Sequence, residues 1–150
     1  MEPANIRRLS EHDIEQYRNL MALFAVEFAE EETYQNLKPS ESYVAKLLKN
    51  LDMVFLVAHQ KEEVVGGLVA YVLHKFEQER SEVYIYDLAV KSNHRRRGIA
   101  TSLIQALKPI AKEAGAWVIF VQADYVDPPA IKLYESLGVK EEVLHFDIKL

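Results

Sequence analysis

The stretch that most constrains the fold of this chain is RRRGIA, at residues 95–100, because it separates two segments of different periodicity. The apolar run VYIYDLAV precedes it, and Ile99, Leu103, Leu107 and Ile110 then recur at helical spacing. A buried strand, a glycine-containing turn and an amphipathic helix in this order predict a crossover unit. Outward-pointing backbone N–H groups and the start of the helix would make this turn a cradle for a phosphate or pyrophosphate.

The remaining segments predict a mixed α/β layer structure, and a length of 150 residues predicts one domain, residues 1–150. The glycine pair Gly66 and Gly67 lies inside one expected strand and predicts a bulge or the close approach of another backbone. Residues 31–39 are expected to form a loop or a frayed helix end, and residues 117–123 a buried strand. The expected strands are 6–9, 53–60, 64–74, 82–90, 117–123 and 143–148, and the expected helices are 12–30, 40–50, 99–115 and 128–137.

Composition excludes several classes of protein. The chain has no cysteine, which excludes disulfides, thiolate metal sites and cysteine nucleophiles. Its 5 histidines show no ligand spacing, so no metal site is expected. The net charge of −5 disfavours nucleic acid and anionic membranes as partners and is compatible with a cationic partner. Because no apolar run approaches the roughly 18 residues that span a membrane, and the N-terminus lacks a signal-peptide core, we expect a cytoplasmic protein.

Charged residues are distributed unevenly along the chain. Arginines gather at the turn, and acidic residues gather in the first third. The acidic region suits a cation and the basic turn suits an anion, with a solvated surface as the alternative for the glutamates. The acidic residues in question are Glu27, Glu30, Glu31, Glu32 and Glu41.

Two segments resemble the GNAT N-acetyltransferase superfamily. RRRGIA has the Arg-x-x-Gly-x-Ala spacing of its acyl-CoA pyrophosphate loop, and AIKLYESLGV at residues 130–139 is similar to a helix of the family. KFEQERSEVYIYDLAV, VQADYVDPPAIKLYESLG and EEVLHFDI further resemble the type I aminoglycoside 3-N-acetyltransferases, the gentamicin-resistance branch, over most of residues 65–148. Residues 11–50, expected to form much of the acceptor cleft, match less well. The resemblance implies the GNAT fold, a homodimer, and acetyl transfer from acetyl-CoA to the 3-amino group of the central deoxystreptamine ring of a cationic aminoglycoside.

Acyl transfer from a thioester to an amine first needs a donor that is held in place. The resemblance implies that the backbone N–H groups of the turn bind the pyrophosphate. Gly98 lets this backbone approach the pyrophosphate closely. The strand end at residues 88–90 would hydrogen-bond the pantetheine in the manner of an added strand, with the N–H of Leu88 or Val90 as a possible oxyanion donor. The expected cofactor-binding residues are Leu88, Ala89, Val90, Arg95, Arg96, Arg97, Gly98, Ile99, Ala100, Thr101, Asp127 and Tyr134.

The proton transfers need an acid and a base. Tyr134 matches the tyrosine that protonates the thiolate in many relatives, and a phenol with a pKa near 10 is protonated at neutral pH. A core aromatic is the alternative role for Tyr134. Asp124 is the first choice of base for the acceptor amine, and Asp127 is expected either to cap the following helix or to contact the pantetheine. The expected substrate-binding residues are Glu82, Asp87, Asp124, Tyr125 and Asp147, and of these Glu82, Asp87 and Asp147 are rivals for the base.

Two other functions stay open at this point. One is a GNAT enzyme for another amine, such as a polyamine or a protein N-terminus. The other is an acyl-CoA-binding sensor without turnover. Because there is no cysteine nucleophile, direct attack of the amine on the thioester is expected in the enzyme, without a covalent acyl-enzyme.

Overall fold

The computed structural model describes residues 2–150, which fall into two compact units that divide after Phe120. The first unit is built on a five-stranded sheet of order β1-β2-β3-β4-β5. The first four strands pair antiparallel, and helix α3 connects β4 to its neighbour β5, so the sheet is mixed. The strands are β1 (Asn5–Arg8), β2 (Met53–Gln60), β3 (Glu63–His74), β4 (Ser81–Val90) and β5 (Ala116–Val121).

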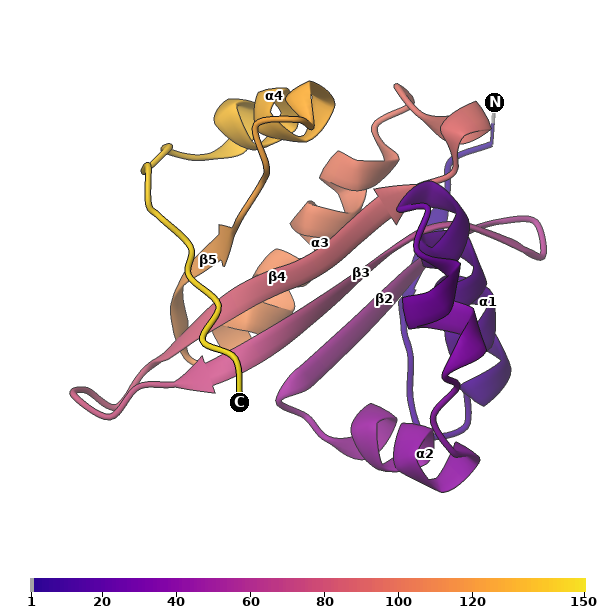
Figure 1. Ribbon diagram of the computed structural model, residues 1–150, viewed down its shortest axis with the longest axis horizontal. Helices are drawn as coiled ribbons and strands as arrows, with labels where there is room; N and C mark the ends of the chain where they lie inside the picture. The colour runs from indigo at the N-terminus through magenta and orange to yellow at the C-terminus, as the bar shows by residue number, and fades with distance from the viewer. Residues whose placement is uncertain (1) are drawn as a thin grey trace. The chain divides into compact units, whose positions relative to one another are not determined.

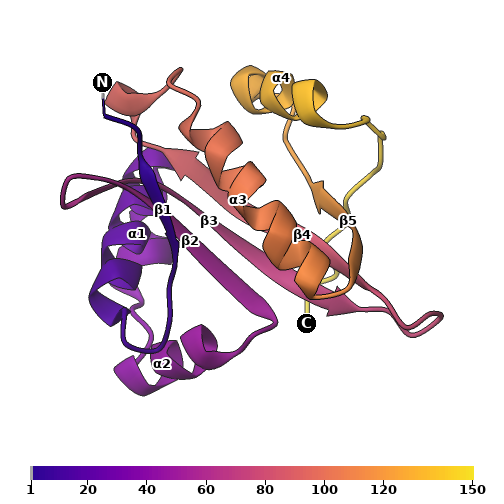
Figure 2. The same ribbon diagram turned by 180° about the vertical axis from the view of Figure 1, so that it is seen from behind.

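Helices cover both faces of this sheet. In Figures 1 and 2, α1 and α2 lie over one face and α3 crosses the other. The second unit, Val121–Leu150, contains α4 and the residues after it. The helices are α1 (Ile14–Glu27), the π-helical turn η1 (Glu32–Asn36), α2 (Glu41–Lys49), the short 3-10 turn η2 (Ser92–His94), α3 (Ile99–Glu113) and α4 (Pro128–Leu137).

The glycine pair in β3 lets helices approach the sheet from both sides. A Cβ atom on Gly67 would overlap the side chain of Leu20 from α1 and lie 2.9 Å from the carbonyl oxygen of Leu56. A Cβ atom on Gly66 would lie 3.2 Å from a methyl carbon of Ile99, at the start of α3. The expected close approach at these two glycines is therefore confirmed, and a register shift between Ala58 and His59 adds the expected bulge.

Apolar side chains at helical and strand spacing form a core on each face of the sheet. On the α1 face, Leu20 and Phe24 are fully buried, and on the α3 face Leu103 and Leu107 are fully buried. Each such side chain contributes about 1.5–3 kcal/mol when it is removed from water. This packing fixes the starts and ends of α1, β4 and α3, which carry the groups considered below.

The expected mixed α/β architecture is confirmed, with differences in three segments. Residues 31–39 hold a π-helical turn where a loop or frayed helix end was expected. Strand β5 is shorter than expected and only half-buried, with Trp117 57% exposed, because it lies at an edge of the sheet.

The expected last strand, 143–148, is wrong: these residues form no strand in the described structure. A strand needs backbone hydrogen bonds from a neighbour, which an alternating pattern alone does not supply. The apolar side chains of the segment are consequently exposed, namely Val143, Leu144, Phe146 and Ile148.

Candidate active site

The turn between β4 and α3 is shaped by its backbone. Arg96 and Gly98 both adopt left-handed conformations, with φ of 61° and 78°. Gly98 is the N-cap residue of α3, and no side chain caps this helix start within the described chain. The first N–H groups of a helix have no intrahelical acceptor and carry its partial positive charge. A Cβ atom on Gly98 would meet nothing within 4 Å, so there is open space beside this residue at the helix start.

A salt bridge ties this turn to α1. The Arg95 guanidinium donates to Glu27 at 2.8 Å and to the carbonyl oxygen of Val90 at 3.2 Å. The second carboxylate oxygen of Glu27 accepts from the backbone N–H of Ser92 at 3.1 Å. Glu27 is therefore not available for a cation, contrary to the grouping of acidic residues expected from the sequence.

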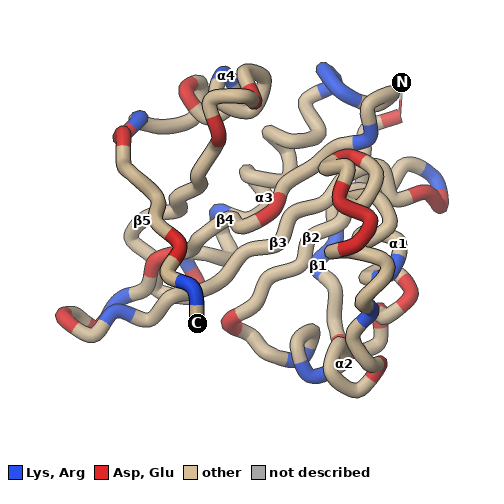
Figure 3. The backbone as a smooth tube through the Cα atoms, in the orientation of Figure 1, with Lys and Arg blue, Asp and Glu red and all other residues tan. Residues whose placement is uncertain are grey.

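Arg96 and Arg97 differ from Arg95, since both are exposed and neither forms a hydrogen bond or ion pair among residues 2–150. Two free guanidinium groups and an uncapped helix start suit an anionic group such as a pyrophosphate. Figure 3 shows the basic run before α3 and the acidic run after α1 as separate stretches of the backbone.

Strand β4 changes register beside this turn. Its last three residues pair with β3 as Leu68↔Leu88, Gly67↔Ala89 and Gly66↔Val90. One step back, Asp87 is opposite Val69 while Ile85 is opposite Ala70, so Tyr86 is an extra residue in a β-bulge. Bulges bend the strand and redirect side chains, and they are frequent next to active sites.

The bulge places Asp87 on the α1 face, where it meets a residue that the sequence analysis did not select. The hydroxyl of Tyr34, from η1, donates to Asp87 Oδ2 at 2.7 Å. Burial raises the pKa of Asp87; the Tyr34 hydrogen bond opposes this effect, and the charge of Glu30 adds to it. Burial also raises the pKa of Tyr34, assisted by the hydrogen bond to Asp87. The two residues lie 53 positions apart, so only an aromatic side chain in an otherwise polar segment could have pointed to Tyr34.

Glu82, at the other end of β4, is engaged by a cation of the protein. Its carboxylate lies 3.6 Å from Lys75 Nζ, and Lys75 also lies 3.5 Å from Glu77. The structure therefore brings Asp87 close to the turn along β4 but leaves Glu82 in a separate ion-pair network.

In the second unit, α4 carries Tyr134 and begins after Asp127. The Asp127 carboxylate accepts from the N–H of Ala130 at 3.3 Å, which confirms the expected helix cap. Burial, together with the charge of Asp127, raises the pKa of Tyr134 to about 12. A phenol in this state remains protonated at neutral pH, as an acid that protonates a thiolate requires.

The other residues expected at the site from this unit are on its surface. Asp124 is exposed, and its carbonyl oxygen accepts from the N–H of Asp127 at 3.0 Å. The Tyr125 hydroxyl lies 3.5 Å from Glu142, and Asp147 Oδ1 lies 2.9 Å from Nε2 of His145. The side chain of His145 is 69% exposed, in the segment where the expected strand is not formed.

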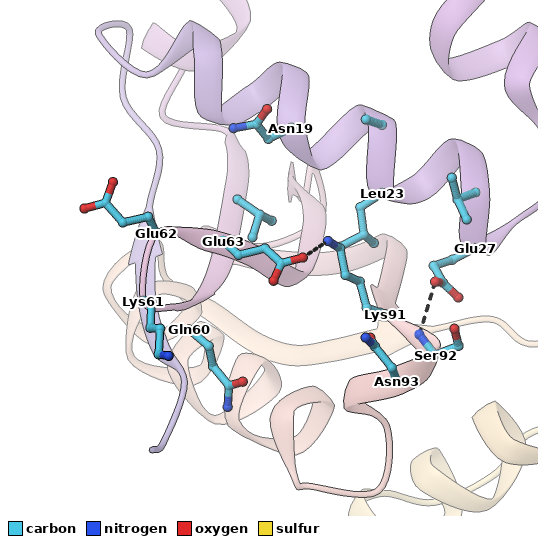
Figure 4. A pocket seen from close by; sticks show the side chains of 13 residues that line it. Asn19, Leu23, Glu27, Gln60, Lys61, Glu62, Glu63, Lys91, Ser92 and Asn93 are labelled. Carbon is cyan, nitrogen blue, oxygen red and sulfur yellow. Dashed lines mark hydrogen bonds and ion pairs between the residues drawn. The ribbon is translucent and has the colours of Figure 1, made fainter. Parts of the chain in front are cut away.

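A groove of about 1000 Å³ lies between α1, the β2–β3 turn and residues 91–93 (Figure 4). Two contacts join groups of its lining: Lys91 contacts Glu63, and the Ser92 N–H donates to Glu27. None of the site residues expected from the sequence lines this groove. In residues 2–150, no group of acidic and histidine side chains could hold a metal ion, and no helix is both long and apolar enough to cross a bilayer.

An anion cradle at the start of α3, next to a bulged strand of a mixed sheet, is the arrangement of an acyl-CoA-dependent acyltransferase. The model of the acetyltransferase (GNAT) family matches residues 14–139, and the chain belongs to this family. GNAT acetyltransferases use acetyl-CoA, which supplies the activated acetyl group. The expected fold and cofactor are thereby confirmed, and the free N–H groups and arginines of the turn fit the pyrophosphate of that cofactor.

Two solved structures and two curated relatives illustrate what the chain is similar to. An aminoglycoside acetyltransferase from an uncultured soil metagenomic sample is 51% identical, with a TM-score of 0.97 over 100% of this chain and 99% of that chain. A second one, crystallised with sisomicin, is 36% identical, with a TM-score of 0.89 over 98% of this chain and 96% of that chain. The N-alpha-acetyltransferase of Sulfurisphaera tokodaii is 32% identical over 63% of this chain and 68% of its own length. The chain spans only 54% of the N-acetyltransferase 8B of Rattus norvegicus.

Proposed function

We propose that this chain acetylates an aminoglycoside, at the 3-amino group of the central deoxystreptamine ring, by direct transfer from acetyl-CoA. The observation that carries the proposal is the 51% identity, over the full chain, to an aminoglycoside acetyltransferase. The sisomicin complex of a second relative supports the same class of acceptor. A net charge of −5 agrees with a polycationic acceptor, because opposite charges raise both the association rate and the selectivity.

The proposed roles follow the demands of acyl transfer. The turn before α3 binds the pyrophosphate, and a backbone N–H of Leu88 or Val90 donates to the oxygen on which negative charge develops. Asp124 removes a proton from the acceptor nitrogen as that nitrogen bonds to the acetyl carbon. The Tyr134 hydroxyl gives its proton to the sulfur as the carbon–sulfur bond breaks. Carboxylates among Glu82, Asp87, Asp124 and Asp147, together with the ring of Tyr125, bind the remaining groups of the acceptor.

A thiol-release assay with acetyl-CoA and a panel of acceptors tests this function. Gentamicin and sisomicin should release thiol, and NMR of the product should place the new acetyl group on the 3-amino nitrogen. Spermidine and a peptide with a free N-terminus should be at least about tenfold poorer, a difference of about 1.4 kcal/mol in transition-state binding. Thiol release with the peptide and none with either aminoglycoside would overturn the proposal.

The acid and base are tested in the same assay. Asp124→Asn should lower kcat about 100-fold, the usual size of general-base catalysis, with partial recovery as the pH rises and more acceptor amine is neutral. Tyr134→Phe should lower kcat while acceptor KM stays unchanged. Tyr43→Phe is a matched control, because Tyr43 is 56% exposed on α2 and its hydroxyl has no hydrogen bond among the described residues. A full rate across pH in Asp124→Asn would remove Asp124 from the mechanism.

The second candidate is acetylation of a polypeptide N-terminus. It is favoured by the 32% identity to the archaeal N-alpha-acetyltransferase. The peptide arm of the acceptor panel distinguishes it from the main proposal.

The proposal includes a homodimer. Six large apolar side chains after α4 are exposed, and an apolar surface of this kind is typical of an interface that a second copy covers. Light scattering should therefore give about twice the chain mass of 17.3 kDa. A mass equal to one chain at micromolar concentration would contradict the dimer.

A further inference from the structure

The contact between Tyr34 and Asp87 leaves half of a carboxylate free. Asp87 Oδ2 accepts from the Tyr34 hydroxyl at 2.7 Å, whereas Oδ1 has no hydrogen bond in residues 2–150. No lysine, arginine or histidine of the described chain forms an ion pair with Asp87. A partly buried carboxylate of this kind usually has a cationic partner, because burial without one is unfavourable.

Tyr34 is held in place by aromatic packing from α1. Its ring lies 5.7 Å from the ring of Phe24 and 5.8 Å from that of Phe28, and the two phenylalanine rings stack at 5.2 Å. The N–H of Tyr34 donates to the carbonyl oxygen of Glu30 at 3.2 Å. The hydroxyl therefore stays at a fixed point above β4 without support from Asp87.

The groups that face Asp87 from the neighbouring elements are acidic or aromatic. Glu30 approaches from just after α1, and its charge raises the pKa of Asp87. Tyr34 approaches from η1, and its hydrogen bond lowers that pKa. Tyr71 of β3 and Tyr84 and Tyr86 of β4 lie on the same face of the sheet. The rings of Tyr71 and Tyr84 each lie 5.7 Å from that of Tyr86, which is 60% exposed.

This environment suits one chemical group. A carboxylate oxygen surrounded by tyrosine rings binds an alkyl ammonium group by charge, by hydrogen bonding and by contact of the cation with a ring face. The flat faces of exposed tyrosines also suit the carbon skeleton of a sugar or cyclitol. An amine that is to be acetylated must be neutral, so the ammonium group bound here is a second amino group of the acceptor.

We infer that Tyr34 is a positioning residue for the acceptor: its hydroxyl holds Asp87 so that Oδ1 receives an ammonium group of the acceptor that is not itself acetylated. The inference rests on the proposed function in requiring an acceptor with more than one amino group. It selects Asp87 among the carboxylates considered for acceptor binding, and it gives the π-helical turn after α1 a role in specificity.

Steady-state kinetics of Tyr34→Phe test the role of the hydroxyl. Phenylalanine keeps the ring packing against Phe24 and Phe28, so the fold should be retained. The KM for sisomicin should rise about tenfold, while kcat and the KM for acetyl-CoA change less than about twofold. An acceptor with a single amino group should show no change in KM, which a general loss of structure would not spare. Tyr43→Phe should leave all of these values unchanged.

A double-mutant cycle tests whether Tyr34 acts through Asp87. Asp87→Asn should raise the sisomicin KM about 30-fold or more, and adding Tyr34→Phe to it should cost less than about a further twofold. An unchanged sisomicin KM in Tyr34→Phe, or additive effects of the two substitutions, would overturn the inference.

Calorimetric binding of sisomicin to the same variants separates this inference from the proposed function. If the wild type binds and acetylates sisomicin and Tyr34→Phe binds it with the same affinity, only the proposed role of Tyr34 is contradicted. If the wild type neither binds nor acetylates any aminoglycoside, both proposals are contradicted. Binding that weakens about tenfold in Tyr34→Phe supports the inference even where product release limits turnover.

Discussion

The turn before α3 and the Tyr34–Asp87 contact lie at the same end of β4 but are built in different ways. The turn is made of backbone: two left-handed residues and an uncapped helix start within one short stretch. The Tyr34–Asp87 contact is made of side chains that are 53 positions apart. A site made of backbone N–H groups depends little on side-chain identity and suits a group shared by a whole family, such as a pyrophosphate. A site made of distant side chains can change with few substitutions and suits the acceptor.

Helix α1 connects the two regions. Near its end, Glu27 binds Arg95 and the N–H of Ser92 in the turn, and Phe24 packs against Tyr34. The position of α1 on the sheet depends in turn on the absence of a side chain at Gly67, where Leu20 packs. Three substitutions, ordered from the largest to the smallest expected change in stability, test how far the two regions depend on this shared support.

Gly67→Ala should affect both regions, because the new methyl group would overlap Leu20 and lie 2.9 Å from the backbone of Leu56. Overpacking of this kind costs about 2–3 kcal/mol of the free energy of unfolding. Urea denaturation measures the loss, and the KM values for acetyl-CoA and for the acceptor should rise together as α1 shifts. Gly66→Ala is the matched control, since its contacts of 3.2 Å or more require smaller adjustments. Equal stability of the two variants would show that α1 is not held by this contact.

The turn could be predicted from sequence because its cause is local. A strand run, a glycine and an amphipathic helix follow one another in about 30 residues, and each signals its own backbone conformation. The Asp127 cap and the glycine pair in β3 were predictable for the same reason. Roles within one short segment follow from the residues of that segment.

The acceptor side could not be predicted in the same way. Three contacts depend on how distant elements pack: Glu27 with Arg95, Lys75 with Glu82, and Tyr34 with Asp87. A run of acidic residues in the sequence therefore did not reveal which members are paired within the protein. The segment 143–148 shows the same limit, because its alternating pattern gives strand propensity but no partner strand.

Gly98→Ala should affect the turn alone. At φ of 78° an alanine is strained by about 1–2 kcal/mol, and there is open space around its Cβ, so strain is the only expected cost. The KM for acetyl-CoA should rise, and the KM for the acceptor should not. Arg96→Gly is the control with the opposite sign: it removes the strain of a left-handed arginine, so stability should increase while affinity for acetyl-CoA falls. If both KM values rise in Gly98→Ala, the two regions are more tightly coupled than the contacts through α1 indicate.

Asp87→Asn should have the smallest effect on stability, and in the opposite direction. Burial raises the pKa of Asp87, so the folded state holds this proton more tightly than the unfolded chain. The contribution of Asp87 to stability is therefore complete below the ordinary aspartate pKa of about 4 and is lost as the pH rises through the raised value. Asparagine does not titrate, and its carbonyl oxygen can still accept from Tyr34.

The variant should consequently match the wild type near pH 3 and be more stable at pH 7, by at most about 1 kcal/mol because solvent screens a half-buried charge. Thermal unfolding across this pH range measures the difference. A variant that is less stable at pH 7 would mean that a cation of the protein neutralises Asp87. Higher stability combined with a raised acceptor KM would instead show that this carboxylate is kept for binding at a cost to the fold. The backbone N–H groups at the start of α3 should show no such opposition, because they belong to a helix that forms with or without the pyrophosphate.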